Sequence, residues 1–285
     1  MTSKIIFITG CSSGIGFDAA LALKHRGHRV IASCRKWVDV ERLQQLGLKT
    51  LQLDMNDEQS IAMAVKTLLQ KTNGRIDVLI NNAGYGQAGA LEDVSRQALI
   101  AQFNTNVFGL MELTRLIIPV MRQQSSGRII NISSLLGFVS MPFRGAYNAS
   151  KYAVEGLSDT LRLELKPAGI KVITIQPGPI DSRFRDHVVE DSLQHIDMVH
   201  SRFKQQYQHM LSEFKTIKNQ SMFTQKTDAV IKKLIRAIET KSPKPKYLVT
   251  FPAYLFMVLR RILSVSLLDK FMMMISKREM SDSME

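Results

Sequence analysis

Three side chains in the middle of the chain could carry out acid–base chemistry together. Tyr147 follows Ser134 by 13 positions and Lys151 follows Tyr147 by 4, so the tyrosine and the lysine would share one face of a helix. A phenol with its usual pKa of about 10 is a poor base at neutral pH, but a neighbouring ammonium stabilises the phenolate and lowers that pKa. We therefore expect Tyr147 to exchange a proton with a substrate oxygen, Lys151 to lower the tyrosine's pKa, and Ser134 to hold that oxygen.

A glycine-rich turn near the start of the chain predicts a dinucleotide site. It joins an apolar run to an amphipathic segment, so Gly10 would permit a tight turn, Gly14 a close approach of the nucleotide, and Gly16 the packing of helix on strand. Unpaired N–H groups and the helix dipole would favour a pyrophosphate at the start of the helix. The other residues that we expect to contact the cofactor in this turn are Ser12, Ser13 and Ile15.

The residues after the second apolar run predict which cofactor binds. An acidic side chain there binds the ribose hydroxyl of NAD, whereas an arginine accommodates the 2′-phosphate of NADP. This chain has Arg35 and Lys36 and no carboxylate at that place. Arg35 could make a forked contact with the phosphate, with Lys36 and Ser12 as supplements, so we expect NADP(H). An arginine with no cofactor contact remains the alternative.

Apolar runs alternate with amphipathic segments, which predicts a parallel sheet covered by helices on both faces. Helices are expected at 14–26 and 227–239, the second capped by Thr227 and Asp228. The fold class is α/β, a Rossmann fold in one domain at 1–250, with a doubly wound, mostly parallel sheet of seven strands. Those strands are expected at 5–9, 29–33, 49–53, 76–81, 128–132, 171–176 and 247–249.

In order and spacing, the motifs resemble those of the short-chain dehydrogenase/reductase family over most of the chain. Arg35 and the Cys11-Ser12-Ser13 form of the turn are similar to its NADP-dependent hydroxysteroid and retinol dehydrogenase branch, which includes bacterial aldehyde reductases. Singly, each catalytic side chain could be merely structural, whereas their joint occurrence is typical of this family. The motifs are Thr9-Gly-x-x-x-Gly-Ile-Gly16, Asn81-Asn82-Ala83-Gly84, Asn106, Ile132-Ser133-Ser134, Tyr147-x-x-x-Lys151 and Pro177-Gly178.

The resemblance implies roles for further residues. Tyr147 would also contact the cofactor, Lys151 would bind the nicotinamide ribose, and the main-chain carbonyl of Asn106 would hold a water that relays protons. Asn81 is expected to join the central strands rather than to touch substrate. The resemblance also implies a homodimer or homotetramer, formed through the helix at 97–124 and the helix that follows Tyr147, although internal packing would explain the same apolar stripes. The additional cofactor contacts that it implies are Asp54, Asn82, Ala83, Gly84, Pro177, Gly178, Ile180 and Ser182.

Residues 181–224 depart from the regular pattern and are expected to cover the substrate. Their aromatic and methionine side chains could line an apolar cleft or could be ordinary helix packing. The histidines of this segment lack the spacing of a metal site, so we expect no metal. The side chains considered for the cleft are Phe184, Phe203, Tyr207, Met210 and Phe214.

Residues 251–285 extend beyond the part that resembles the family. The segment 254–275 is strongly apolar, but Arg260-Arg261 and Asp269-Lys270 interrupt it. A membrane-spanning helix needs about 20 largely uninterrupted apolar residues, so spanning is disfavoured. The extension could be a lid, a subunit contact or an amphipathic helix on a membrane surface.

Composition narrows the remaining possibilities. The net charge of +13 could favour nucleic acid, acidic lipid or a phosphorylated cofactor, but no nucleic-acid-binding motif accompanies it, so we expect no nucleic-acid partner. The two cysteines, Cys11 and Cys34, offer no disulfide framework, and residues 1–30 do not form a signal peptide. We therefore expect a cytoplasmic protein, with peripheral membrane contact open.

The hypothesis drawn from the sequence is an NADPH-dependent reductase of a lipophilic aldehyde or ketone, reversible in principle, with Ser134 and Tyr147 as the substrate contacts. One alternative is an alcohol, hydroxysteroid or retinol dehydrogenase that works mainly in oxidation. The other is a non-enzymatic protein that senses NADP(H). The presence of Tyr147 argues against the sensor, because nucleotide binding alone does not require it.

Overall fold

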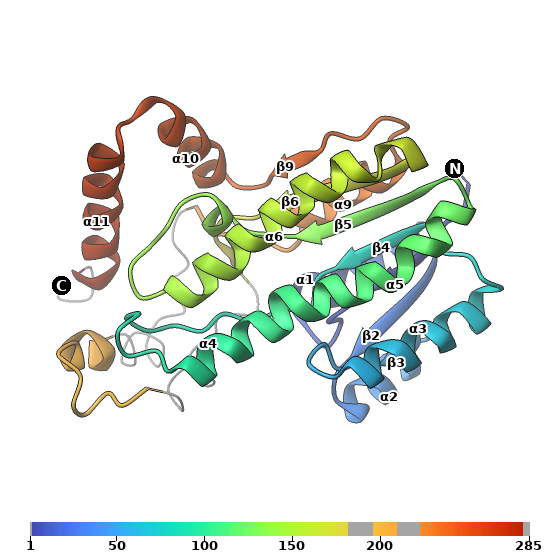
Figure 1. The fold of residues 1–285 in the computed structure, drawn as a ribbon, viewed down its shortest axis with the longest axis horizontal. Helices are drawn as coiled ribbons and strands as arrows, with labels where there is room; N and C mark the ends of the chain where they lie inside the picture. Colours follow the sequence, from blue (N-terminus) through green and yellow to red (C-terminus); the bar gives the residue numbers. More distant parts are fainter. Residues whose placement is uncertain (1, 182–195, 210–222, 282–285) are drawn as a thin grey trace.

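A twisted parallel sheet forms the centre of the computed structural model, which describes residues 2–181, 196–209 and 223–281, with side chains as far as Ser276. The strand order is β3-β2-β1-β4-β5-β6-β9, and all neighbouring strands are parallel (Figure 1). Two short strands, β7 (Ile180–Asp181) and β8 (Gln225–Lys226), pair outside this sheet. The seven strands are β1 (Ile5–Ile8), β2 (Arg29–Cys34), β3 (Lys49–Gln52), β4 (Val78–Asn81), β5 (Gly127–Ile132), β6 (Ile170–Gln176) and β9 (Lys246–Leu248).

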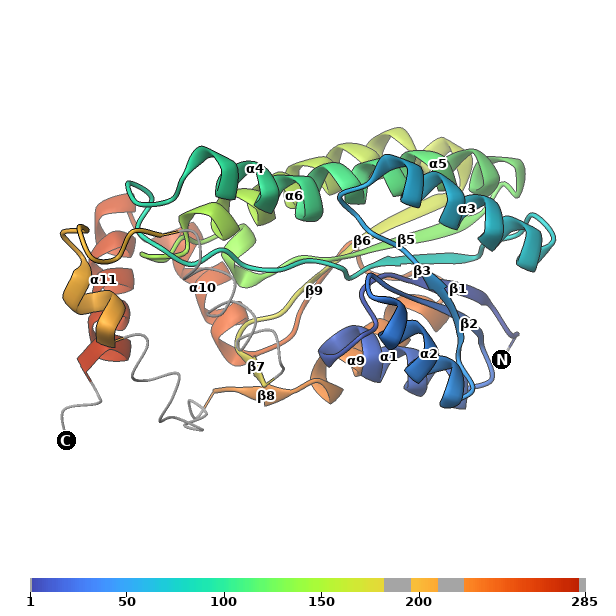
Figure 2. The ribbon, with the colours of Figure 1, turned by 90° about the horizontal axis from the view of Figure 1, so that it is seen from below.

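Helices cover both faces of the sheet, as Figure 2 shows from the side. One layer consists of α1 (Gly14–His25), α2 (Trp37–Gln45) and α9 (Asp228–Glu239). The opposite layer consists of α3 (Glu58–Thr72), α4 (Arg96–Phe103), α5 (Leu110–Gln123) and α6 (Gly145–Glu164). Short helical turns are the π-helix η1 (Asn104–Gly109) and the 3-10 turns η2 (Leu135–Gly137) and η3 (Lys166–Ala168).

The central strands carry buried apolar side chains on both faces of the sheet, which explains why a layer of helices packs on each face. Ile6 and Ile8 of β1 pack with the α1 layer, whereas Phe7 between them packs with the α3 layer, because successive strand residues point to opposite faces. All three side chains are fully buried. The strand order reverses between β1 and β4, and in such sheets ligands bind at the carboxyl ends of the strands beside this reversal.

The predicted fold class is confirmed, and each observed strand of the main sheet lies within two residues of its predicted limits. One local prediction was wrong, and one predicted helix differs in detail. Thr227 does not cap α9 with its side chain; its hydroxyl donates instead to Asp18 on α1 at 2.6 Å. The helix expected at 97–124 is interrupted by the π-helix η1, where Gly109 approaches the backbone of Met55 so closely that a Cβ would lie 2.0 Å from its carbonyl oxygen.

The C-terminal extension forms two further helices, α10 (Phe251–Ile262) and α11 (Val265–Ser281). Ala253, Phe256 and Met272 are buried against Leu135 and Phe138 in the loop that follows β5. Within the described parts of the chain, no helix is long and apolar enough to cross a membrane. The boundary that we placed between residues 250 and 251 stays a prediction.

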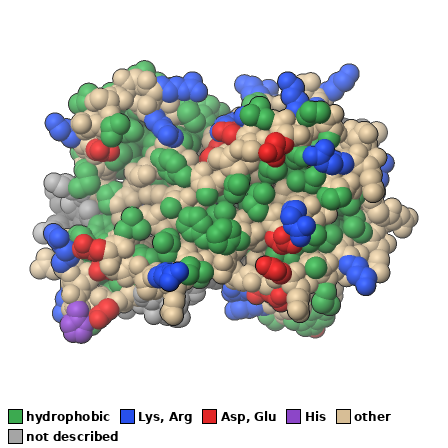
Figure 3. Space-filling view, viewed as in Figure 1, with side chains coloured by type: hydrophobic (Ala, Val, Ile, Leu, Met, Phe, Trp, Pro, Cys, Tyr) green, Lys and Arg blue, Asp and Glu red, His purple; other side chains and the backbone are tan. Residues whose placement is uncertain are grey.

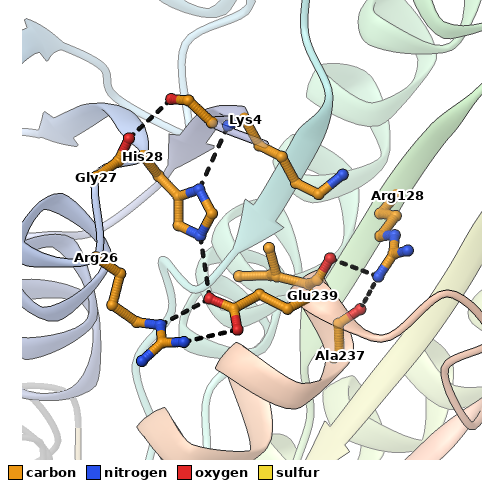
Figure 4. A network of polar contacts seen from close by, with 9 residues as sticks. Lys4, Arg26, Gly27, His28, Arg128, Ala237 and Glu239 are labelled. Atoms are coloured by element: carbon orange, nitrogen blue, oxygen red, sulfur yellow. Dashed lines mark hydrogen bonds and ion pairs between the residues drawn. The ribbon is translucent and has the colours of Figure 1, made fainter. Parts of the chain in front are cut away.

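A polar network closes the edge of the sheet where the strands begin, away from their carboxyl ends (Figure 4). Glu239 at the end of α9 accepts from Arg26 at 2.6 Å, and the ring of His28 lies 3.3 Å from the same carboxylate. Arg128 of β5 donates to the last carbonyls of α9, at Ala237, at Ile238 (2.6 Å) and at Thr240 (2.8 Å). These contacts tie α9 to the sheet.

We expect Arg128→Met to destabilise the fold by about 2 kcal/mol, because terminal helix carbonyls lose a charged donor while the aliphatic stem is kept. Urea unfolding at neutral pH measures this loss. Arg122→Met, at an exposed arginine on α5, is the matched control and should change the free energy of unfolding little. Equal stability of the two variants would contradict the proposed anchoring of α9.

Candidate active site

The glycine turn has the backbone conformation that a dinucleotide site requires. Gly10 and Gly14 have φ values of +69° and +58°, which only glycine adopts without strain. A Cβ on Gly16 would lie 2.3 Å from the carbonyl oxygen of Gly10. Ser13 begins α1 without a side-chain cap, and the first turn of the helix contains no acidic residue. Its backbone N–H groups thus suit an anion, and the residues of this turn fit a pyrophosphate.

Basic side chains gather beside the turn at the end of β2. Arg35 and Lys36 are exposed there, as the sequence predicts for a phosphate contact. Arg42 on α2 was missed: its guanidinium donates to the carbonyl of Ser12 at 2.5 Å and lies 5.5 Å above the ring of Phe17. No motif in the sequence marks Arg42, because its contact with Ser12 arises only when the last turn of α2 packs beside the glycine turn.

The residues that follow β3 and β4 lie at the carboxyl edge of the sheet, beside the glycine turn. The side chain of Asn82 donates to the carbonyls of Thr9 and Gly10, both at 2.9 Å, so it holds the glycine turn in place. A Cβ on Gly10 would lie 2.7 Å from the Cα of Ala83, which explains the glycine at position 10, and a Cβ on Gly84 would lie 2.9 Å from Oδ1 of Asn106. Asp54 follows β3 and accepts from the N–H of Asn56 at 2.9 Å. The roles of these residues toward a cofactor stay predictions.

Ser134, Tyr147 and Lys151 come together at the carboxyl end of β5. Ser134 lies two positions after this strand, accepts from the N–H of Leu136 at 3.1 Å, and acts on the hydroxyl of Tyr147 on α6, whose pKa it lowers. The ammonium of Lys151 lies 5.6 Å from the centre of the tyrosine ring and donates to the carbonyl of Ile132 at 2.8 Å. The structure therefore brings together the hydroxyl pair and the cation that the sequence predicts.

The pKa of Tyr147 differs from our expectation. Burial raises the pKa of Tyr147 to about 12, although the Ser134 hydrogen bond and the charge of Arg144 act in the opposite direction. Burial also lowers the pKa of Lys151 to about 8, against the charge of Glu155, which raises it. The predicted lowering of the tyrosine's pKa by Lys151 was wrong here, because the ammonium is directed to Ile132 and desolvation dominates.

Asn106 lies within the π-helix η1 and is buried. Its side-chain oxygen accepts from the N–H of Tyr85 at 3.1 Å, and its amide donates to the carbonyl of Tyr85 and to Ser150 Oγ. Ser150 precedes Lys151 on α6, so Asn106 fixes η1 against the helix that carries the catalytic residues. π-Helical turns are frequent at functional sites, and the relay role of Asn106 stays a prediction.

Asn81 has the structural role expected of it. Its amide donates to Thr114 at 3.0 Å and to Asn131 at 2.9 Å, linking β4 to α5 and β5. Asn131 in turn donates to Ser158 of α6 at 2.8 Å. This chain of amides holds α5 and α6 against the sheet below the catalytic residues.

The turn after β6 packs against the loop at 133–139, which follows β5 and which we call the catalytic loop. The N–H of Leu135 donates to the carbonyl of Pro177 at 2.7 Å, and a Cβ on Gly178 would lie 2.1 Å from Thr250 Oγ1. Ile180 follows in β7 and is buried. Ser182, predicted to contact the cofactor, lies outside the described residues.

Residues 196–209 are the described part of the segment expected to cover the substrate. They pack beside the loops that precede α4 and α6. Tyr207 is buried, and its hydroxyl donates to Asp93 at 2.7 Å and accepts from the N–H of Ala90 at 2.9 Å. The rings of Phe203 and Tyr207 meet Phe143 edge-on. Phe203 and Tyr207 therefore pack against the loops before α4 and α6. Phe184, Met210 and Phe214 lie outside the described residues.

Comparison with known proteins identifies the family. Residues 4–193 match the family model described as short chain dehydrogenase. The chain belongs to the short-chain dehydrogenase family. The prediction of this family is thus confirmed, and with it the assignment to oxidoreductases that act on alcohol or carbonyl groups.

Two relatives and one solved structure extend this finding. The chain is 38% identical to the uncharacterized oxidoreductase YbbO of Escherichia coli (strain K12) over 94% of this chain and 93% of that protein. It is 32% identical to human 17-beta-hydroxysteroid dehydrogenase type 1 over 88% of this chain and 78% of that protein. A short-chain dehydrogenase from Streptomyces avermitilis has a TM-score of 0.76 and 26% identity, over 98% of this chain and 97% of that one. The resemblance to the hydroxysteroid branch is confirmed.

Proposed function

We propose that this short-chain dehydrogenase reduces a lipophilic aldehyde or ketone to the alcohol, with NADPH as the hydride donor, in a reaction that is reversible in principle. The observation that carries the proposal is that the hydroxyls of Ser134 and Tyr147 come together beside Lys151. Two hydroxyls at one point can hold a carbonyl oxygen and supply the proton that it needs after hydride transfer.

The glycine turn supports the cofactor part of the proposal. NADPH would supply the hydride when bound, with its pyrophosphate at the start of α1. Arg35 lies at the end of β2, and Arg42 donates to the carbonyl of Ser12. Both arginines would bind the 2′-phosphate. Lys151 would hold the ribose and Asn106 would support the proton relay, as in the family.

The protonation state of Tyr147 suits its role as the acid in reduction. With its pKa raised to about 12, the phenol keeps its proton at neutral pH and can donate it to a developing alkoxide. Ser134 would orient the substrate oxygen. In oxidation the same side chain would act as the base, so the direction of the reaction depends on the supply of NADPH and NADP⁺.

An apolar environment supports a lipophilic substrate. Tyr147 packs against the cluster formed by Leu135, Phe138, Ala253 and Phe256, so one side of the catalytic residues is lined by hydrocarbon. The steroid in the name of the human relative is itself lipophilic. We propose a substrate of this general class without choosing among aliphatic, retinoid and steroid carbonyls.

We propose a homodimer or homotetramer in the cytoplasm. Exposed apolar side chains gather on the face formed by α4, η1 and α6, at Ile100, Phe108, Tyr152 and Leu163 (Figure 3). A face of this kind suits a subunit contact. Cys11 and Cys34 are buried free thiols, which fits a reducing compartment.

A substrate panel tests the proposal. The purified protein is assayed with NADPH and with NADH against aliphatic, aromatic, retinoid and steroid carbonyls, and with NADP⁺ against the matching alcohols. We expect turnover of apolar carbonyls with NADPH. Turnover of alcohols alone would favour the oxidative alternative, and tight NADPH binding with no turnover would favour a sensor.

Glu155 should set the pH dependence of the reaction. Its carboxylate raises the pKa of Lys151, which burial lowers to about 8, so the catalytic cation is lost as the pH rises through that value. We expect kcat/KM for reduction to fall above about pH 8, and Glu155→Gln to move this fall about one unit lower.

The pH profile of kcat/KM measures this effect, and Asp159→Asn is a matched control. Glu155 and Asp159 both pair with Lys246, at 2.9 Å and 3.0 Å, but of the two only Glu155 acts on Lys151. The control should therefore keep the parent profile. An unchanged profile in Glu155→Gln would show that Lys151 does not titrate in the catalytic reaction.

A further inference from the structure

The helix α10 is apolar on two opposite sides. Ala253 and Phe256 are buried on its inner side, against the loop that follows Ser134. On the outer side, side chains spaced by 3, 4 and 4 positions face solvent. These are Phe251, Tyr254, Val258 and Ile262, with exposed fractions of 59%, 46%, 55% and 68%, and we call them the outer stripe. Internal packing therefore explains only the inner side.

Further apolar side chains continue the outer stripe. Phe223 is 47% exposed and stacks on Phe251, with ring centres 5.7 Å apart, so both members of an aromatic pair face solvent. After α10, Val265 is 76% exposed and Met274 is 57% exposed. An exposed apolar surface of this extent on two consecutive helices marks a contact with another apolar phase.

Basic side chains border this surface. Between residues 251 and 276 the chain has three basic residues, Arg260, Arg261 and Lys270, against one acidic residue, Asp269. Arg261 lies three positions after Val258, so it shares the side of the outer stripe, while Arg260 lies 5.6 Å above the ring of Tyr152 on α6. In Figure 3 apolar and basic side chains lie together over the corner that α10 and α11 occupy.

This charge decides between two occupants of the surface. A second copy seated on this surface would bring the same basic residues against each other, whereas an anionic lipid surface would attract them. Aromatic and aliphatic side chains on one helix face, with arginines beside them, also match the composition of helices that lie in the headgroup region. Arginine can extend its charge to the headgroups while its stem stays among apolar groups.

We propose that the outer stripe of α10, continued by the start of α11, seats the protein on the surface of an anionic bilayer. The helix would lie in the plane of the interface, with its inner side still packed on the catalytic loop. The outer stripe shares no residue with the exposed face of α4, η1 and α6, although Arg260 joins the two at Tyr152, and the proposal does not depend on the reaction assigned above.

Flotation with vesicles tests this inference on the full-length protein. One set of vesicles contains phosphatidylserine and phosphatidylcholine in equal parts, and the other contains phosphatidylcholine alone. We expect the parent protein to float with the anionic vesicles, to bind the neutral ones far less, and to be released by high salt. Val258→Glu combined with Ile262→Glu should reduce binding to anionic vesicles at least about tenfold.

Controls separate the surface from folding and from catalysis. Met63→Glu makes the same kind of change at a 70% exposed residue on α3 and should float like the parent. Circular dichroism checks that the double variant is folded, and Tyr147→Phe should bind vesicles normally whatever its activity. Equal flotation of the double variant and the parent would overturn the inference, as would a parent that binds neither vesicle. Dissociation of an oligomer by the double variant, without vesicle binding by the parent, would assign the stripe to a second copy instead.

Discussion

Replacing Tyr147 with phenylalanine is expected to lower kcat/KM for carbonyl reduction by about 1,000-fold. The change removes only the hydroxyl, and the ring that packs beside Leu135 and Phe138 is kept. Without the phenol, the pair at Ser134 loses the acid that would protonate the substrate oxygen. NADPH affinity should stay within about a factor of two, because the proton donor is not the group that holds the phosphates.

Steady-state kinetics with the best carbonyl of the panel measure this loss, and fluorescence titration measures NADPH binding. Tyr152→Phe is the matched control, because Tyr152 lies on the same helix, five positions after Tyr147, and contacts Arg260 rather than the catalytic loop. We expect the control to retain the parent rate. Equal rates for Tyr147→Phe and the parent would refute the assignment of Tyr147 as the acid.

Replacing Arg35 with alanine is expected to raise the Kd of NADPH by about 30- to 100-fold and to change the Kd of NADH little. Charge-assisted hydrogen bonds to a phosphate are worth about 2–3 kcal/mol, and NADH lacks the phosphate that receives them. Arg35 is exposed at the end of β2, so its removal should not disturb the sheet.

Titration of both cofactors into the parent, Arg35→Ala and Arg42→Ala tests this discrimination. Arg42 donates to the carbonyl of Ser12, so its loss should weaken NADPH binding too, by a smaller factor. Arg122→Ala on α5 provides a control for a simple change in net charge. Parallel losses of NADPH and NADH affinity in Arg35→Ala would contradict the phosphate contact.

Much of the fold could be predicted because its strands are short apolar runs between turn signals. The run at Ile5–Ile8 followed by Gly10 predicts both a buried strand and the turn into α1. Local pattern could not predict η1, because the π-helix arises where Gly109 meets the backbone of Met55, more than fifty positions away. The cap of α9 was missed for a similar reason, since Asp18 competes for the hydroxyl of Thr227.

The catalytic group could be predicted because the spacing on α6 and the serine after β5 are local features. Its electrostatics could not, because burial and the direction of Lys151 toward Ile132 depend on packing. Arg42 and Glu155 were missed because no motif marks them. Arg42 gains its role from Ser12, which is 30 positions away in the sequence. Glu155 gains its role from Lys151, one turn earlier on α6. The contact of α10 with the catalytic loop likewise joins segments more than one hundred positions apart.

The central claim is that the hydroxyls of Ser134 and Tyr147 hold the reacting oxygen, and a crystal structure with NADP⁺ and the alcohol product tests it most directly. We predict the alcohol oxygen within about 2.6–3.2 Å of both hydroxyls. An alcohol bound elsewhere, or one whose oxygen lies beyond hydrogen-bond distance from the Tyr147 hydroxyl, would contradict the account.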